Sequence, residues 1–154
     1  MVVLVIPFLL TADLRSGRLQ PDLPLPLLQI LIGALLFLIG LLLLVWTVRL
    51  FIRLGRGTLA PWDPTKALVT QGPYAHVRNP MIAGVLFMIL AEAILLGSWR
   101  LLGWFLFFGV INTIYFHLSE EPGLVRRFGD EYLAYRANVP MWIPRLRPWH
   151  RHSR

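Results

Sequence analysis

The sequence contains no cysteine and few charged residues, and both shortages limit what the chain can be. Without cysteine there is no disulfide framework, no thiolate metal site and no cysteine nucleophile, so the redox compartment is left open. Only 15% of the 154 residues are charged, whereas 56% are hydrophobic, which is too apolar for an ordinary soluble domain of this length. The composition therefore predicts an integral membrane protein.

Acidic residues are especially scarce, with eight against fifteen lysines and arginines, and the formal net charge is +7. A surplus of this size could attract nucleic acid, but no basic stripe with interleaved aromatic residues lies outside the hydrophobic segments. In a membrane protein, excess lysine and arginine mark the cytoplasmic face and contact anionic lipid headgroups. The charge therefore indicates membrane lipids as partners and argues against nucleic acid.

Long hydrophobic runs are what the chain does have. Three are long enough to cross a bilayer as helices, at about residues 27–54, 81–97 and 101–118. A shorter apolar run at about 1–14 predicts a short or tilted additional helix and not a signal peptide, because no basic residue precedes it. Residues 97–100 are the whole connection between the last two runs, which forces an antiparallel hairpin. We expect one all-α membrane domain, residues 1–154.

The basic residues predict how these helices are oriented. Twelve lie around the segment 55–80 or after Leu118, whereas three, Arg15, Arg18 and Arg100, lie on the other side. This bias places the larger group on the cytoplasmic face, most simply of the cell (inner) membrane. Because two helices separate the segment 55–80 from residues 119–154, both are expected on that face.

The segment 55–80 is polar and interrupted by four prolines, so it cannot form one continuous helix. Flexible linkers are built from glycine, serine and charge, but this segment also carries residues that favour burial: Trp62, Leu68, Val69 and Tyr74. A long segment of this kind inside a small protein is typical of a binding loop. We therefore expect a folded loop across the cytoplasmic ends of the helices.

Residues 119–138 predict two short amphipathic helices on the cytoplasmic surface, followed by an extended, proline-containing tail. Ser119 is a suitable N-cap, and Glu120 and Glu121 then occupy a first turn, where negative charge is favoured by the helix dipole. Gly129 is a natural break between the two helices. One apolar face is expected from the spacing of Leu124, Phe128, Tyr132 and Tyr135.

Two motifs flank the hydrophobic hairpin. The first reads Gly72-Pro73-Tyr74-x-x-Val-Arg-Asn-Pro, and the second reads Glu120-Glu121-x-x-Leu-x-x-x-Phe-Gly-x-x-Tyr-x-x-Tyr-x-x-x-Val-Pro. Taken in this order, they resemble the isoprenylcysteine carboxyl methyltransferase and phospholipid methyltransferase family of integral membrane enzymes, over about residues 58–144. The resemblance implies transfer of a methyl group from S-adenosyl-L-methionine, held in a cytoplasmic pocket, to a lipophilic acceptor that arrives from the bilayer.

The resemblance also implies which residues bind the cofactor. The family's usual Arg-His-Pro-x-Tyr reads Arg-Asn-Pro-Met-Ile over residues 78–82 here, so an amide replaces an imidazole and an aliphatic side chain replaces a phenol. Glu120 matches a carboxylate that contacts the cofactor, and a carboxylate suits its ribose hydroxyls and ammonium group. The full expected set is Lys66, Ala67, Leu68, Val69, Gly72, Tyr74, Asn79, Pro80, Met81, Ile82, Glu120 and Glu121.

Arg78, Asn79 and His117 are the candidate catalytic residues. The prenylcysteine enzymes carry an arginine about one turn before the glutamate pair, where this chain has Tyr115-Phe116-His117. Methyl transfer from a sulfonium needs alignment, desolvation and at most the removal of a proton, so no metal site is expected.

Two other functions stay open at this point. A membrane sterol-type reductase would bind NADPH, although its 2′-phosphate calls for more basic residues than Lys66 and Arg78. A small non-catalytic membrane scaffold, or a family member that has lost activity, is the second, and Asn79 and Ile82 give it weight. The sequence also leaves open whether the acceptor atom is oxygen, nitrogen or sulfur. It does not indicate the oligomeric state.

Overall fold

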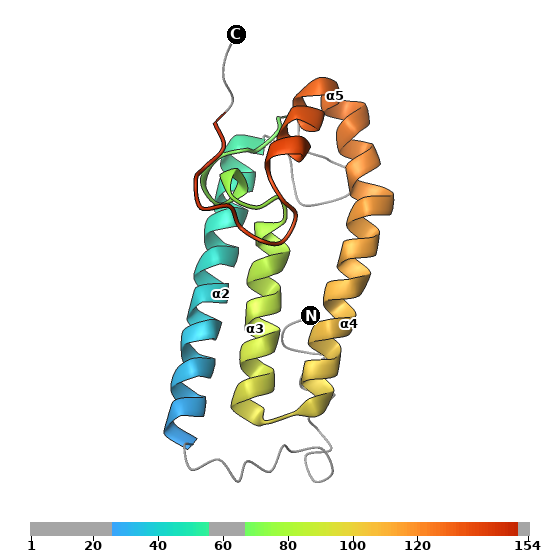
Figure 1. The fold of residues 1–154 in the computed structure, drawn as a ribbon. Helices are drawn as coiled ribbons and strands as arrows, with labels where there is room; N and C mark the ends of the chain where they lie inside the picture. The colour runs from blue at the N-terminus through green and yellow to red at the C-terminus, as the bar shows by residue number, and fades with distance from the viewer. Residues whose placement is uncertain (1–25, 56–66, 151–154) are drawn as a thin grey trace. The chain divides into compact units, whose positions relative to one another are not determined.

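The computed structural model describes residues 26–55 and 67–150. Its regular elements are all helical, and no β-strand occurs in this part of the chain, which confirms the all-α class. The expected helix at 1–14 and Lys66 lie outside the described residues. The elements, shown in Figure 1, are α2 (Pro26–Gly55), the 3₁₀-helix η1 (Gly72–Ala75), α3 (Pro80–Leu96), α4 (Trp99–Tyr115), the π-helix η2 (Phe116–Glu120) and α5 (Glu121–Asn138).

Two helical stretches are long and apolar enough to cross a membrane. They are Leu27–Gly55 in α2 and the continuous run Trp99–Asn138, while the apolar helix α3 is shorter, at 17 residues. Helices α2 and α3 begin and end within one residue of the predicted runs 27–54 and 81–97. That all three runs span a bilayer stays a prediction.

The described residues fall into two compact units, one made of residues 26–42 and 84–113 and the other of residues 43–55, 67–83 and 114–150. In the first unit, α2 approaches α3 closely at a glycine. A Cβ atom at Gly40 would lie 2.7 Å from the carbonyl oxygen of Gly84 and 2.9 Å from Cγ of Met88. Only a residue without a side chain fits there, which is a common device at contacts between membrane helices.

The hairpin between α3 and α4 has the short connection that the sequence predicts. Gly97, with φ of 56°, adopts the left-handed conformation that ends α3. Ser98 then caps α4, because its Oγ accepts a hydrogen bond of 3.4 Å from the backbone N–H of Leu101. The antiparallel hairpin is therefore confirmed.

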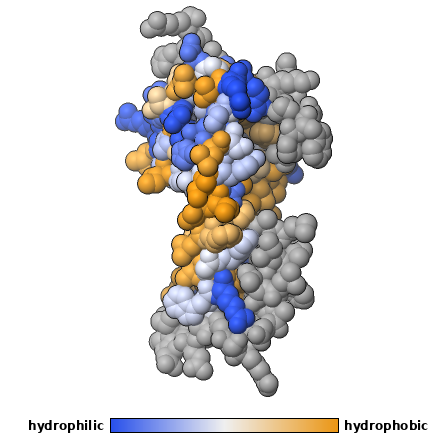
Figure 2. Space-filling model, turned by 90° about the vertical axis from the view of Figure 1, so that its right-hand side faces the viewer, coloured by the Kyte–Doolittle hydropathy of each residue, from blue (hydrophilic) through white to orange (hydrophobic). Residues whose placement is uncertain are grey.

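Helix α4 presents large apolar side chains to the outside. Figure 2 looks onto the side of this helix and shows mostly hydrophobic residues along it, whereas hydrophilic residues gather around α5. The exposed side chains of α4 include Leu106, Phe107, Val110 and Ile114. A contiguous exposed surface of this kind is typical of a helix that contacts lipid.

In the second unit, α4 continues through η2 into α5 without a break. Within η2 the helix widens, so that the backbone N–H of Glu121 donates to the carbonyl of Phe116, five residues earlier. Pro122 follows at once, and because proline has no backbone N–H, a widened turn accommodates it inside a continuous helix. The predicted N-cap at Ser119 is therefore wrong, since Ser119 lies inside η2.

Helix α5 bends sharply at Gly129, where φ is 50° and ψ is −128°. Helix α5 is therefore two short helices joined at a kink, as expected, and the break lies at the glycine where the sequence predicts it. The bend lets the two halves share a core built around Tyr132, Tyr135 and Val139. Leu68, Leu124, Val125, Phe128 and Trp149 pack against this cluster, which confirms the predicted apolar face.

Candidate functional site

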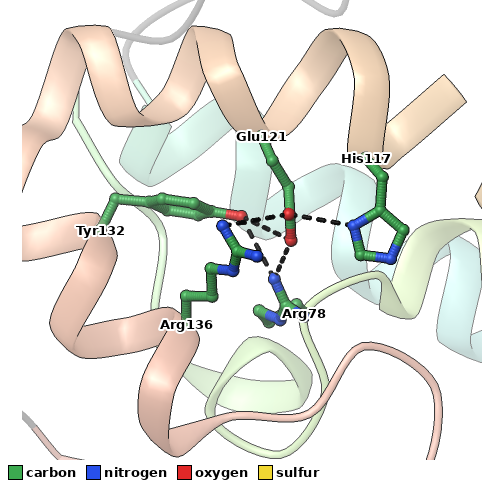
Figure 3. Close-up of polar contacts among 5 residues, drawn as sticks. All are labelled: Arg78, His117, Glu121, Tyr132 and Arg136. Atoms are coloured by element: carbon green, nitrogen blue, oxygen red, sulfur yellow. Dashed lines mark hydrogen bonds and ion pairs between the residues drawn. The ribbon is translucent and has the colours of Figure 1, made fainter.

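The carboxylate of Glu121 is the centre of a polar cluster in the second unit (Figure 3). Its side chain is 4% exposed, and its Oε1 accepts a hydrogen bond and ion pair from Arg78, whose side chain is 9% exposed. Oε1 also accepts a hydrogen bond of 3.4 Å from the hydroxyl of Tyr132. Oε2 lies 3.0 Å from Nδ1 of His117 and 3.4 Å from Nη1 of Arg136.

These contacts keep Glu121 ionised. Burial alone would raise the pKa of its carboxyl group, but hydrogen bonds from His117 and Arg78, together with the charges of Arg78 and Arg136, hold it below its usual range. Each carboxylate oxygen has two partners in this cluster. A buried charge this well satisfied is a stable arrangement only as long as its partners are present.

Local structure explains how the cluster forms. His117 and Glu121 are four residues apart on the same helical run, and so lie on one face. Tyr132 and Arg136 are also four residues apart, on the second half of α5, and the bend at Gly129 returns that half toward Glu121. Neither Tyr132 nor Arg136 was predicted as a site residue. Their helical spacing was visible in the sequence, but the direction of the bend was not.

The tail after Asn138 lies along residues 74–78. Backbone hydrogen bonds join the two segments, from Trp149 to Ala75 (2.9 Å), from Arg145 to His76 (3.0 Å) and from Arg78 to Pro140 (2.9 Å). The hydroxyl of Tyr135 adds a bond of 2.7 Å to the carbonyl of Tyr74, and Nδ1 of His76 bonds to the carbonyl of Arg145 at 2.7 Å. The tail thus holds the described part of the predicted binding loop in place. The sequence predicts that loop and tail meet on one face, and these bonds show which residues do so.

Glu120 differs from its neighbour. Its side chain is exposed, but the surrounding protein atoms partly desolvate the carboxylate and so raise its pKa. The positive charge of Arg127 has a smaller, lowering effect on the same pKa. Burial, and after it the charge of Glu120, raise the pKa of Tyr74, so these two side chains lie within electrostatic reach. Within the described residues, no hydrogen bond joins the carboxylate of Glu120 to a protein group.

The other predicted site residues of the loop belong to the same unit. Gly72 has φ of 59°, and a Cβ there would lie 2.8 Å from Cδ1 of Leu50, so glycine is needed. Nε of Arg78 is buried without a hydrogen-bond partner among the described residues. Val69, Tyr74, Asn79 and Pro80 are buried, whereas Ala67, Leu68, Gly72, Met81 and Ile82 are half-buried.

An open cleft of about 570 Å³ adjoins the polar cluster. Its volume lies in the range typical of small-molecule sites. The lining side chains are His117, Glu121, Pro122, Val125, Arg126 and Arg136.

Comparison with known proteins identifies the family. A sequence model of the phospholipid methyltransferase family matches residues 28–131. The chain belongs to this family. The resemblance seen in the two motifs is therefore confirmed, and both motifs begin inside the matched region.

Two relatives show how far the similarity extends. The chain is 40% identical over 83 residues to protein-S-isoprenylcysteine O-methyltransferase of Schizosaccharomyces pombe, which covers 50% of this chain and 33% of that protein. It is 34% identical over 76 residues to methanethiol S-methyltransferase 2 of Bradyrhizobium diazoefficiens, which covers 47% of this chain and 27% of that protein. The chain thus spans a third or less of the length of these family members. No solved structure matches it.

Proposed function

We propose that the chain is a membrane methyltransferase that transfers a methyl group from S-adenosyl-L-methionine to a lipophilic acceptor. The observation that carries this proposal is the buried ion pair between Arg78, from the first family motif, and Glu121, from the second. Family membership supports the reaction class and favours it over a reductase or a scaffold. The two relatives are named for O-methylation and S-methylation, which supports methyl transfer without deciding the acceptor atom.

The polar groups around this ion pair fit the cofactor. Glu120 offers a carboxylate with no protein hydrogen bond among the described residues, which suits an ammonium group or ribose hydroxyls. The buried Nε of Arg78 is an unpaired donor that suits the cofactor's carboxylate. Tyr74 and Asn79 are both buried and belong to the same loop segment as Arg78. When bound, the cofactor supplies a methyl group already activated by a positively charged sulfur.

The protein's own contribution is to position the reacting groups. Glu121 holds Arg78 and His117 in fixed places, because its carboxylate is buried and contacts both. The backbone bonds from the tail order residues 75–78 beside them. Holding two reactants in alignment can supply about 7–11 kcal/mol of a reaction barrier, and we propose that these ordered groups act in this way.

We further propose that the apolar helices lie in the bilayer and that the polar cluster lies at its cytoplasmic face. The exposed apolar surface of α4 and the bias of twelve basic residues to three support this orientation. A prenyl or acyl tail of the acceptor would stay between the helices or in lipid while its head group reaches the site. A reporter fused after Arg154 is expected on the cytoplasmic side, and a periplasmic signal would reverse the orientation.

Calorimetric titration of the full chain in detergent tests the proposal. Wild type should bind S-adenosyl-L-methionine and not NADPH. Glu120→Ala should weaken binding about ten- to a hundredfold, because a charge-assisted hydrogen bond worth roughly 1.5–3 kcal/mol is lost. Asp130→Ala, which removes an exposed acid of α5 beyond the bend at Gly129, is the matched control and should bind normally. Failure of wild type to bind the cofactor would overturn the proposal.

A further inference from the structure

The imidazole of His117 is held by a carboxylate on one side and open on the other. Nδ1 lies 3.0 Å from Oε2 of Glu121, which is ionised and can only accept a hydrogen bond. A neutral His117 therefore carries its proton on Nδ1 and has a lone pair on Nε2. Figure 3 shows Nε2 pointing away from Glu121. The side chain of His117 is 46% exposed and lines the cleft.

This geometry matches that of a general base. A buried carboxylate that accepts from Nδ1–H fixes the tautomer, orients the ring and stabilises the imidazolium that forms when Nε2 takes a proton. Glu121 cannot turn away, because Arg78 and Tyr132 hold its other oxygen. Among the described residues, the other charged groups beside His117 are Arg136, which lies on Oε2 of Glu121, and Arg126, which also lines the cleft.

We infer that His117 removes a proton from the methyl acceptor, and that the acceptor is a weak acid, a thiol or a phenol-like hydroxyl, bound in the cleft. This inference rests on the proposed function. The acceptor's proton goes to Nε2 of His117, and the acceptor atom forms a bond to the methyl carbon. The bond between that carbon and the sulfonium sulfur breaks, and the sulfur keeps the electron pair and becomes a neutral thioether.

The charges around the cleft select this class of acceptor. Arg126 and Arg136 favour the anion that forms when the acceptor loses its proton, and they disfavour an ammonium head group. A carboxylate acceptor is already ionised at neutral pH and has no proton to give. A histidine base would therefore have no proton to remove from a carboxylate, whereas it can remove one from a thiol or a phenol-like hydroxyl.

The test uses the full chain in detergent, labelled S-adenosyl-L-methionine and three acceptors that share one alkyl tail and end in a thiol, a carboxylate or an amine. The thiol should be methylated fastest. His117→Gln should lower kcat for the thiol about a hundredfold or more at neutral pH, with little change in KM. The loss should shrink as the pH rises, because the free thiolate then forms without a base. His150→Ala, which removes an exposed histidine of the tail, is the control and should match wild type.

Other readouts separate the possible failures. Calorimetry should show unchanged cofactor binding in His117→Gln, and the wild-type pH profile of kcat/KM should have an acidic limb that the variant lacks. A variant with the wild-type profile, or a wild type that prefers the carboxylate or the amine, would overturn the inference and leave methyl transfer standing. A wild type that neither binds the cofactor nor methylates any acceptor would overturn the proposed function itself.

Discussion

Replacing Glu121 by alanine should destabilise the fold strongly, although the residue beside it can be replaced at little cost. The side chains of Glu121 and Arg78 are 4% and 9% exposed, so both charges have lost nearly all of their water. Removing one partner of such a pair typically costs 3–5 kcal/mol, because the other charge is left buried and unpaired. His117 and Arg136 are 46% and 47% exposed, so solvent screens their share. We therefore expect a loss of about 3 kcal/mol, mostly from Arg78.

Equilibrium unfolding in mixed micelles, followed by circular dichroism, measures this loss. Glu120→Ala is the matched control, since it removes an exposed carboxylate one residue away, and it should change the free energy of unfolding by no more than about 0.5 kcal/mol. The double variant Arg78→Met with Glu121→Leu should recover most of the loss, because no charge is then left buried. Equal stability of the two single alanine variants, or a double variant as unstable as Glu121→Ala, would refute the reasoning.

Three further predictions concern packing, the acceptor and pH. Gly40→Ala should destabilise the chain by about 1–3 kcal/mol, because its Cβ would lie 2.7 Å from the carbonyl oxygen of Gly84, while Gly103→Ala, with nothing within 4 Å, should be neutral or stabilising in the same unfolding assay. For acceptors with one head group, kcat/KM should rise with tail length by up to ~0.8 kcal/mol per buried methylene, and a flat series would argue against entry from the bilayer. The pKa of Glu121 in the folded state lies below its ordinary value of 4.5. The ionised carboxylate therefore contributes its full stabilisation above pH 4.5, and this stabilisation is lost as the pH falls through the folded-state pKa. Wild type should therefore lose more stability than Glu121→Ala on acidification below about pH 4.5, and parallel acid curves would count against an ionised Glu121.

The hydrophobic pattern by itself determined the positions of the helices. Residues 27–54 and 81–97 agree with α2 and α3 within one residue, because a long apolar run can satisfy its backbone hydrogen bonds only within a helix when water is absent. The two motifs determined the family for a similar reason, since each combines residue types at fixed spacing. The break at Gly129 was also readable, because glycine adopts a positive φ without strain.

Only the tertiary structure decided which of the two adjacent carboxylates is buried. Neighbouring residues on a helix point about 100° apart, so one of the pair faces Arg78 and the other does not. Which one does so depends on the phase of the helix, and the widened turn of η2, which ends at Glu120, shifts that phase at the pair itself. The spacing of hydrophobic residues in the sequence does not reveal such a shift. The sequence predicts that the tail and the loop meet, but not which residues pair, because that pairing depends on backbone groups that every sequence shares.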